Sequence, residues 1–245
     1  MTIEIDRRGT LTMTNLVRVF YATDEVFSSL SEQPQWRMPV VASLLMAFLF
    51  TVMVLNSIDL QVMTRKQLES YPQLAEKLGK ERIDEMVKRS DSTAQKIITG
   101  VTATLTDGFL ILLVSGLLTG LFWLMNGITS FRKVLSVTAY VFYLYYLVVT
   151  VLTAVVIIST PDKSTIQMDG LVKSSLGSLL NGTGVSKPLL NLLYSLDVLS
   201  LGSLLLLAFG LSRVGLRLSF RKATLALAGL WCLWVVVKVG FSALL

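Results

Sequence analysis

Asp197 is the residue in this sequence whose type and surroundings best suit it to do chemistry. It lies in the apolar segment LLYSLDVLSLGS, with Tyr194 three residues before it and Ser200 three residues after it. An ionisable side chain in such surroundings is costly to bury, so it is a functional candidate by default. A carboxylate flanked by two hydroxyl groups could bind an ion, a ligand or a partner, and it could equally be a structural group. Both interpretations remain open.

Lys238 is a candidate partner of Asp197. It lies in the last apolar stretch, seven residues before Leu245, and its long stem could snorkel the ammonium toward water. The alternative is an ion pair with Asp197, because a paired charge is easier to retain in apolar surroundings than a lone one. The sequence therefore predicts an intramembrane polar site consisting of Asp197, Lys238, Tyr194 and Ser200.

The sequence lacks the residues and motifs on which most enzymatic reactions depend. The chain has no histidine, which removes the common acid or base at neutral pH and the commonest zinc ligand. Its one cysteine, Cys232, and its scattered carboxylates show no metal-ligand spacing, and no phosphate-binding loop motif occurs. We therefore predict no catalytic residue, no cofactor and no metal site, and we interpret the protein as non-enzymatic.

The elements that would position these residues are long apolar stretches. Apolar residues make up 53% of the chain and charged residues only 16%, against about a quarter charged in soluble domains. About five stretches reach the roughly 18 residues needed to cross a membrane, and each should be a helix because lipid cannot satisfy backbone polar groups. The predicted fold is all-α, a polytopic membrane bundle of five transmembrane helices. The stretches are 39–58, 101–126, 134–159, 189–211 and 223–245.

Two patterns within these stretches indicate helix packing. Gly116 and Gly120 form a GxxxG spacing in the second stretch, which lets another helix approach closely. The third stretch carries an aromatic run, which we interpret as packing and interfacial surface rather than as a ligand-binding box. The residues of that run are Tyr140, Phe142, Tyr143, Tyr145 and Tyr146.

The charge distribution predicts the topology of the chain. The net charge of +6 and pI near 9.5 arise from basic residues spread over loops beside the apolar stretches, so we predict no nucleic-acid partner. Two short connections are purely basic and should lie in the cytoplasm, which places the N-terminus inside and the C-terminus outside. Their basic residues are Arg132, Lys133, Arg213, Arg217, Arg221 and Lys222.

Two regions should lie outside the hydrocarbon core. Residues 1–38 form a cytoplasmic or interfacial N-terminal segment that precedes the membrane domain at 39–245. In this segment we expect Thr23 to cap a short helix, and Leu16, Phe20, Phe27 and Leu30 to contact the inner leaflet. Residues 59–100 are highly charged and predict an extramembrane helical loop that continues into the second span, with Asp91 or Ser92 as the cap.

Several segments taken together resemble one membrane-protein family. They are LVRVFYATDEVFSSLSEQPQWRMPVV with Pro34, Trp36 and Pro39, FRKVLSVTAYVFYLYYL, and LDVLSLGSLLLLAFGLSRVGLRLSFRKA with Asp197 and Gly210. This pattern resembles the Yip (Ypt-interacting protein) family, and in particular its bacterial branch. A proline common after the Ala-Tyr pair in the family is absent after Tyr140.

The resemblance implies a five-span bundle with a cytosolic N-terminus. It also implies an integral, multi-pass protein of a bacterial cytoplasmic membrane that organises the bilayer or protein partners without catalysis. Its expected partners are the lipid bilayer and other membrane proteins or further copies of itself. The alternative is a small transporter, or an accessory subunit of an envelope export system, that uses Asp197 in a polar pocket between helices.

Overall fold

The computed structural model describes residues 13–69, 76, 78–127, 129–160, 172, 174–180 and 186–244. The sequence NGTG at 181–184, which is a turn signal, and Arg7, Arg8 and Pro72 lie outside these residues. Regular structure in the described part is helical. The helices are α2 Thr23–Ser29, α3 Arg37–Ser57, α4 Leu60–Glu69, α6 Lys80–Ser90, α7 Thr93–Leu124, α8 Phe131–Ser159, α9 Leu176–Leu179, α10 Lys187–Ser195, α11 Val198–Val214 and α12 Phe220–Leu244.

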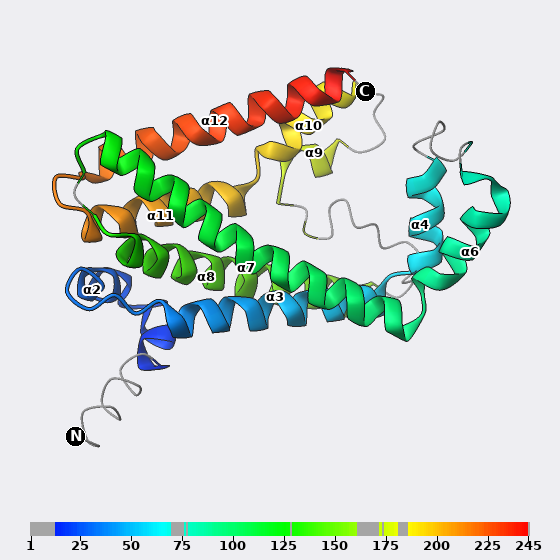
Figure 1. The fold of residues 1–245 in the computed structure, drawn as a ribbon, viewed down its shortest axis with the longest axis horizontal. Helices are drawn as coiled ribbons and strands as arrows, with labels where there is room; N and C mark the ends of the chain where they lie inside the picture. The colour runs from blue at the N-terminus through cyan, green and yellow to red at the C-terminus, as the bar shows by residue number, and fades with distance from the viewer. Residues whose placement is uncertain are drawn as a thin grey trace.

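The long helices run side by side along the length of the molecule, as Figure 1 shows. Within the described residues, α3, α7, α8 and the part Phe220–Phe241 of α12 are long and apolar enough to cross a membrane. The apolar α11 has 17 residues, which at 1.5 Å per residue gives about 26 Å and lies at the short end of spanning helices. The predicted all-helical membrane bundle is confirmed, with α11 as its short fifth member.

The fourth predicted span, 189–211, is not one continuous helix, and this part of the prediction is wrong. Helix α10 ends at Ser195 and α11 begins at Val198, with Leu196 between them at φ −82° and ψ 72°. The cause is local: the side chain of Asp197 accepts a hydrogen bond from the backbone N–H of Ser200. An aspartate in this position starts a new helix in preference to continuing the old one.

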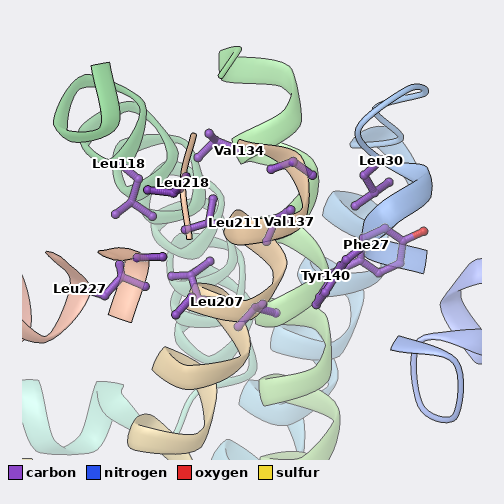
Figure 2. Packing of buried hydrophobic residues seen from close by; sticks show 14 of the residues in the cluster. Phe27, Leu30, Leu118, Val134, Val137, Tyr140, Leu207, Leu211, Leu218 and Leu227 are labelled. Atoms are coloured by element: carbon purple, nitrogen blue, oxygen red, sulfur yellow. The ribbon is translucent and has the colours of Figure 1, made fainter. Parts of the chain in front are cut away.

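Helix α8 is the central element of the bundle, because it packs against α3, α7 and α11. Helix α12 lies on the outside and packs along both α10 and α11. The main core lies at the end of the bundle where α7 connects to α8 and α11 to α12 (Figures 1 and 2). There Val134 and Val137 of α8 cluster with Leu211 of α11 and Leu118 of α7.

The N-terminal helix α2 packs against the bundle. Phe27 and Leu30 are 0% exposed, and the Phe27 ring lies edge-on to Tyr140 of α8 with their centroids 6.4 Å apart (Figure 2). Their predicted insertion into the inner leaflet is therefore wrong. Phe20, which is 49% exposed, keeps a surface that can contact lipid.

The predicted cap of α2 is also wrong. Ala22 is the N-cap residue and makes no side-chain capping bond, while Thr23 Oγ1 donates to the Val19 carbonyl at 2.7 Å. A threonine hydroxyl turned back onto the preceding turn cannot accept from the N–H groups of the next one. Helix α2 is instead held by its buried apolar side chains and by an ion pair between Asp24 and Arg213 of α11 at 2.7 Å.

The charged segment after α3 forms a helical pair, in agreement with the sequence. Helices α4 and α6 pack against each other, and Arg65 pairs with Asp84 at 2.9 Å. Ser92 then caps α7, with its side chain accepting from the Gln95 N–H. The second span thus continues without interruption from the charged segment, as predicted.

Candidate functional site

The break between α10 and α11 places Asp197 at the first turn of α11. Its Oδ2 accepts two hydrogen bonds from Ser200, one from the backbone N–H at 2.8 Å and one from Oγ at 2.6 Å. The structure therefore brings these two residues of the predicted polar site together. The carboxylate acts as a helix cap, and it neutralises part of the positive end of α11.

The backbone at the break is satisfied by residues 174–176. Ser175 and Asp197 form an antiparallel bridge: the Leu176 N–H donates to the Leu196 carbonyl at 3.2 Å, and the Val198 N–H donates to the Ser174 carbonyl at 3.0 Å. Non-helical backbone inside a membrane protein is tolerated only where protein or water satisfies its polar groups. The segment before α9 meets this need.

Tyr194 supports the same arrangement from α10. It lies against Gly177 of α9, where a Cβ would come within 2.7 Å of the Tyr194 ring. Only glycine allows so close an approach without a shift of the neighbouring chain. Tyr194 therefore helps to position the segment that pairs with the helix break.

Lys238 does not pair with Asp197. Four ion pairs link described residues, and none joins these two side chains. The predicted ion pair is therefore absent from the described residues, where the Asp197 carboxylate instead accepts hydrogen bonds from Ser200. Lys238 lies on α12 as a partly buried side chain. The four ion pairs are Arg18–Glu25, Arg65–Asp84, Asp91–Lys96 and Asp24–Arg213.

The second carboxylate oxygen of Asp197, Oδ1, is buried and has unused hydrogen-bonding capacity. The Ser174 side chain and the Leu199 N–H approach the carboxylate, but Oδ1 has no hydrogen bond of regular geometry. The carboxylate also lies close enough to Tyr145 of α8 to interact with it electrostatically. A buried acceptor without a regular partner in a folded protein calls for an explanation.

A second carboxylate, Asp107 of α7, lies near Tyr146 of α8. It sits near the middle of α7, and its side chain interacts with the hydroxyl of Tyr146. Tyr146 and Tyr145 are adjacent, with ring centroids 5.7 Å apart and rings at 74°. Two neighbouring tyrosines of α8 thus interact with two carboxylates, one from α7 and one at the start of α11.

Sequence reasoning missed Asp107, although a signal was present. Asp107 is a charged residue inside the predicted second span, and charges within spans are functional candidates. The interpretation of Tyr145 and Tyr146 as packing residues hid their role as polar partners, because composition alone does not show which face of a helix meets a carboxylate.

In the described part of the chain, the predicted packing pair on α7 has no neighbouring helix against it. A Cβ at Gly116 or at Gly120 would meet no atom within 4 Å. Leu117, between them, is 61% exposed. The use of these glycines in packing against another protein stays a prediction.

A comparison with known protein families identifies the family of this chain. The family model described as the Yip1 domain matches residues 17–242, which covers α2 and every long helix of the bundle. No curated protein and no solved structure matches the chain significantly.

Proposed function

Because the chain belongs to the Yip1 domain family, we propose that it is a non-catalytic membrane protein that self-associates and so organises membrane or protein partners. Its proposed location is a bacterial cytoplasmic membrane, with the N-terminus in the cytoplasm. The family match and the apolar helices support an integral multi-pass protein, and the basic short loops support the orientation.

The observation that carries this proposal is the open face of α7. Gly116 and Gly120 have no neighbour within 4 Å of an added Cβ, and Leu113 and Leu117 beside them are 45% and 61% exposed. Small residues four apart let two membrane helices approach closely enough for backbone contact. A second copy of the chain is the proposed occupant, because the same ridge on both copies fits a two-fold symmetric contact.

A non-catalytic role agrees with the chemistry of the chain. Histidine is absent from the sequence and cysteine occurs once. Among the described residues, no group of three or more histidine, cysteine or acidic side chains could hold a metal ion. The polar groups at the helix break are a carboxylate and hydroxyls, which suit hydrogen bonding and ion binding.

A transporter is the second candidate function, and the helix break favours it. Transporters commonly bind substrates where discontinuous helices expose backbone groups within the membrane. The break at Asp197, with a carboxylate oxygen that has no regular hydrogen bond, has this character. Transport predicts flux that depends on Asp197, whereas assembly predicts oligomers that depend on α7.

The test measures self-association in lipid. The full chain, labelled with donor and acceptor fluorophores, is reconstituted in liposomes at several protein-to-lipid ratios, and energy transfer is recorded. Isoleucine at both Gly116 and Gly120 should weaken association by about tenfold or more, because 1.4 kcal/mol of lost packing corresponds to tenfold. A Cβ at either position meets no described atom within 4 Å, so the fold should be retained.

The matched control is Gly229→Ile on α12, which also has no neighbour within 4 Å. This variant should associate like the unaltered protein. Equal energy transfer for the α7 double variant and the control would contradict self-association through α7. Flux that depends on Asp197 in the same liposomes would favour the transporter.

A further inference from the structure

We propose that one end of the bundle binds anionic phospholipid, whose phosphate groups pair with exposed arginine and lysine side chains. This surface, which we call the basic end, consists of the connection between α7 and α8 and the connection between α11 and α12. The proposal goes beyond self-association, since it uses the end of the bundle and not the face of α7 that carries Gly116 and Gly120. The exposed basic residues of the two connections are Arg132, Arg217, Arg221 and Lys222.

The two connections lie together at the same end of the bundle. Phe122 near the end of α7 and Val134 near the start of α8 belong to one buried cluster with Leu218 and Ala223, which lie on either side of the start of α12. Figure 1 shows both connections at the end where α3 begins. Their exposed side chains therefore meet the same part of the surroundings.

The connection between α11 and α12 is a turn that is fixed by packing. Leu218 is 5% exposed and belongs to the main core. Gly215 lies against it, where a Cβ would be 2.9 Å from the Leu218 Cβ, and the Ser219 carbonyl accepts from the Ala223 N–H at 3.0 Å. Arg217 has a φ of 64°, which is costly for a residue with a side chain. The turn thus presents its outer side chains in a defined arrangement.

Apolar and basic side chains alternate along the outside of this turn. Leu216 is 64% exposed and Phe220 is 46% exposed, and Arg217, Arg221 and Lys222 beside them are also exposed. This combination suits the boundary between headgroups and acyl chains, because the apolar side chains enter the lipid while the charges meet phosphate.

The connection between α7 and α8 shows the same combination. Trp123 and Leu124 are 76% and 73% exposed, and Arg132 follows them at the start of α8. Helix α3 begins at this end with Trp36 and Arg37, whose guanidinium lies 5.6 Å from the centroid of the Trp36 ring. Tryptophan is enriched where a membrane protein meets the headgroups, so both segments fit the level of the lipid phosphates.

The basic side chains at this end outnumber the acidic ones. In the described residues 13–37, 123–127, 129–133 and 213–222, eight basic residues occur with three acidic ones. Two of these acids are already paired, Asp24 with Arg213 and Glu25 with Arg18. The excess positive charge attracts anionic headgroups. The basic residues are Arg18, Arg37, Arg132, Lys133, Arg213, Arg217, Arg221 and Lys222, and the third acid is Glu32.

The opposite end of the bundle has balanced charges. In the described residues 59–69, 76 and 78–96, seven basic residues occur with seven acidic ones. Two ion pairs link some of them, Arg65 with Asp84 at 2.9 Å and Lys96 with Asp91 at 2.8 Å. A balanced surface attracts anionic lipid much less, so this end supplies an internal comparison.

Lipid fits the basic end better than a soluble acidic protein does. Helices α7, α8 and α12 are long and apolar enough to cross a membrane, so their ends at these connections lie near the headgroups. The connections are short, because α7 ends at Leu124 and α8 begins at Phe131, and α11 ends at Val214 and α12 begins at Phe220. Their basic side chains therefore stay within reach of the phosphate layer.

The experiment measures which lipid lies next to the turn between α11 and α12. The full chain carries Cys232→Ser and Leu216→Cys, so a fluorophore attached at position 216 is the only label, because Cys232 is the only cysteine of the sequence. Single copies are placed in nanodiscs of phosphatidylcholine and phosphatidylglycerol. A nitroxide on the acyl chain of one lipid or the other quenches the fluorophore on contact.

Quenching by labelled phosphatidylglycerol should exceed quenching by labelled phosphatidylcholine at equal mole fraction. The excess should fall as NaCl is raised from about 0.1 M to about 1 M, because the Debye length shrinks from about 10 Å to about 3 Å. An apolar contact alone would give equal quenching by the two lipids at both salt concentrations.

Glutamine at Arg217, Arg221 and Lys222 together should lower the preference for phosphatidylglycerol by about fivefold or more, because one basic side chain near an anionic surface contributes about fivefold. The three side chains are exposed and take part in none of the described ion pairs, so the fold should be retained. Arg217→Lys with Arg221→Lys keeps the charge and should keep the preference.

The matched control replaces Arg82, Lys88 and Arg89 of α6 with glutamine. These are again two arginines and one lysine, all exposed and outside the described ion pairs, but they lie at the opposite end of the bundle (Figure 1). The control removes the same net charge from the protein. It should keep the preference measured at position 216.

Equal quenching by the two lipids in the labelled protein with its basic end intact would overturn the proposal. A triple variant at the basic end that keeps the full preference would overturn it as well. If neither lipid quenched the fluorophore, the turn would lie away from the bilayer, and an acidic protein would be the better partner. Because each nanodisc holds one copy and the α7 face is unchanged, these outcomes would leave self-association standing.

Discussion

Gly177 lies directly against Tyr194, and a Cβ added to Gly177 would come within 2.7 Å of both the backbone nitrogen and the Cγ of Tyr194. This contact joins α9 to α10. Because residues 174–176 pair with the backbone at the break between α10 and α11, the contact also fixes the segment that makes the break possible.

Gly177→Ala should therefore destabilise the protein. The added methyl group meets backbone atoms that cannot move aside cheaply, and overpacking of this kind costs about 1–3 kcal/mol. Gly202→Ala on α11 is the matched control, because a Cβ there meets no atom within 4 Å and alanine favours a helix by up to about 1 kcal/mol. Thermal unfolding of both variants in the same lipid compares them, and a more stable Gly177→Ala would contradict the contact.

Asp197 should behave as a helix cap. Asp197→Asn keeps a side-chain oxygen that can accept from the Ser200 N–H, so its stability should stay close to that of the unaltered protein. Asp197→Ala removes the acceptor and should cost about 1 kcal/mol. A large loss in Asp197→Asn would show instead that the negative charge itself is required.

Lys238 should act independently of Asp197, because the described ion pairs do not include these two residues. The losses in Asp197→Ala and Lys238→Met should therefore add in the double variant, within about 0.5 kcal/mol. Chemical or thermal unfolding of the two single variants and the double variant measures this. A double variant that loses clearly less than the sum would restore the ion pair.

The sequence predicted the long apolar helices correctly, but it did not predict the break between α10 and α11. Length and apolarity determine which segments cross a membrane, so α3, α7, α8 and α12 follow directly from composition. The break at Asp197 depends on one side chain capping α11 and on a distant segment, residues 174–176, that satisfies the backbone. Hydropathy contains neither piece of information.

The candidate site was likewise predictable from the sequence only in part. Asp197 was identifiable because a charge within an apolar run is conspicuous, and Ser200 because it lies one turn away. The pairing of Asp107 with Tyr146 depends on the register of α7 against α8, which a single sequence does not encode in any visible pattern. For the same reason, Phe27 was expected in lipid and lies in the core.

Phe27 should anchor α2 to the bundle. Its ring lies against Tyr140 and Phe209, and Gly210 makes room for it, since a Cβ there would be 3.0 Å from the Phe27 ring and 2.5 Å from Val137. Phe27→Ala should cost about 3–5 kcal/mol and release α2. Faster proteolysis near the N-terminus would report the release.

Phe20→Ala is the control for this variant, because Phe20 is 49% exposed and should lose much less packing. Asp24→Asn should have a small effect, under about 1 kcal/mol, since its ion pair with Arg213 is largely exposed. If proteolysis of Phe27→Ala and Phe20→Ala proceeded at equal rates, the buried ring would not be the anchor.

The orientation of the chain in the membrane is the last prediction. The short connections after α7 and α11 lie at one end of the bundle, together with α2, while α4 and α6 lie at the other end (Figure 1). The first end carries Arg132, Arg217 and Arg221 as exposed basic residues, and basic short loops are retained in the cytoplasm. The N-terminus should therefore lie in the cytoplasm and the C-terminus outside.

Reporter fusions at Ser130 and Ser219 should give cytoplasmic activity, and fusions at Gly79 and Gly182 should not. The structure sharpens this test, because Arg213 is paired with Asp24 and so contributes less to orientation than the exposed Arg217 and Arg221 in the same region. Replacing the latter two with glutamine should weaken the cytoplasmic preference at Ser219, whereas Arg213→Gln should leave it nearly unchanged. Cytoplasmic activity at Gly79 would instead mean that the bundle is inserted the other way round, with α2 on the outer surface.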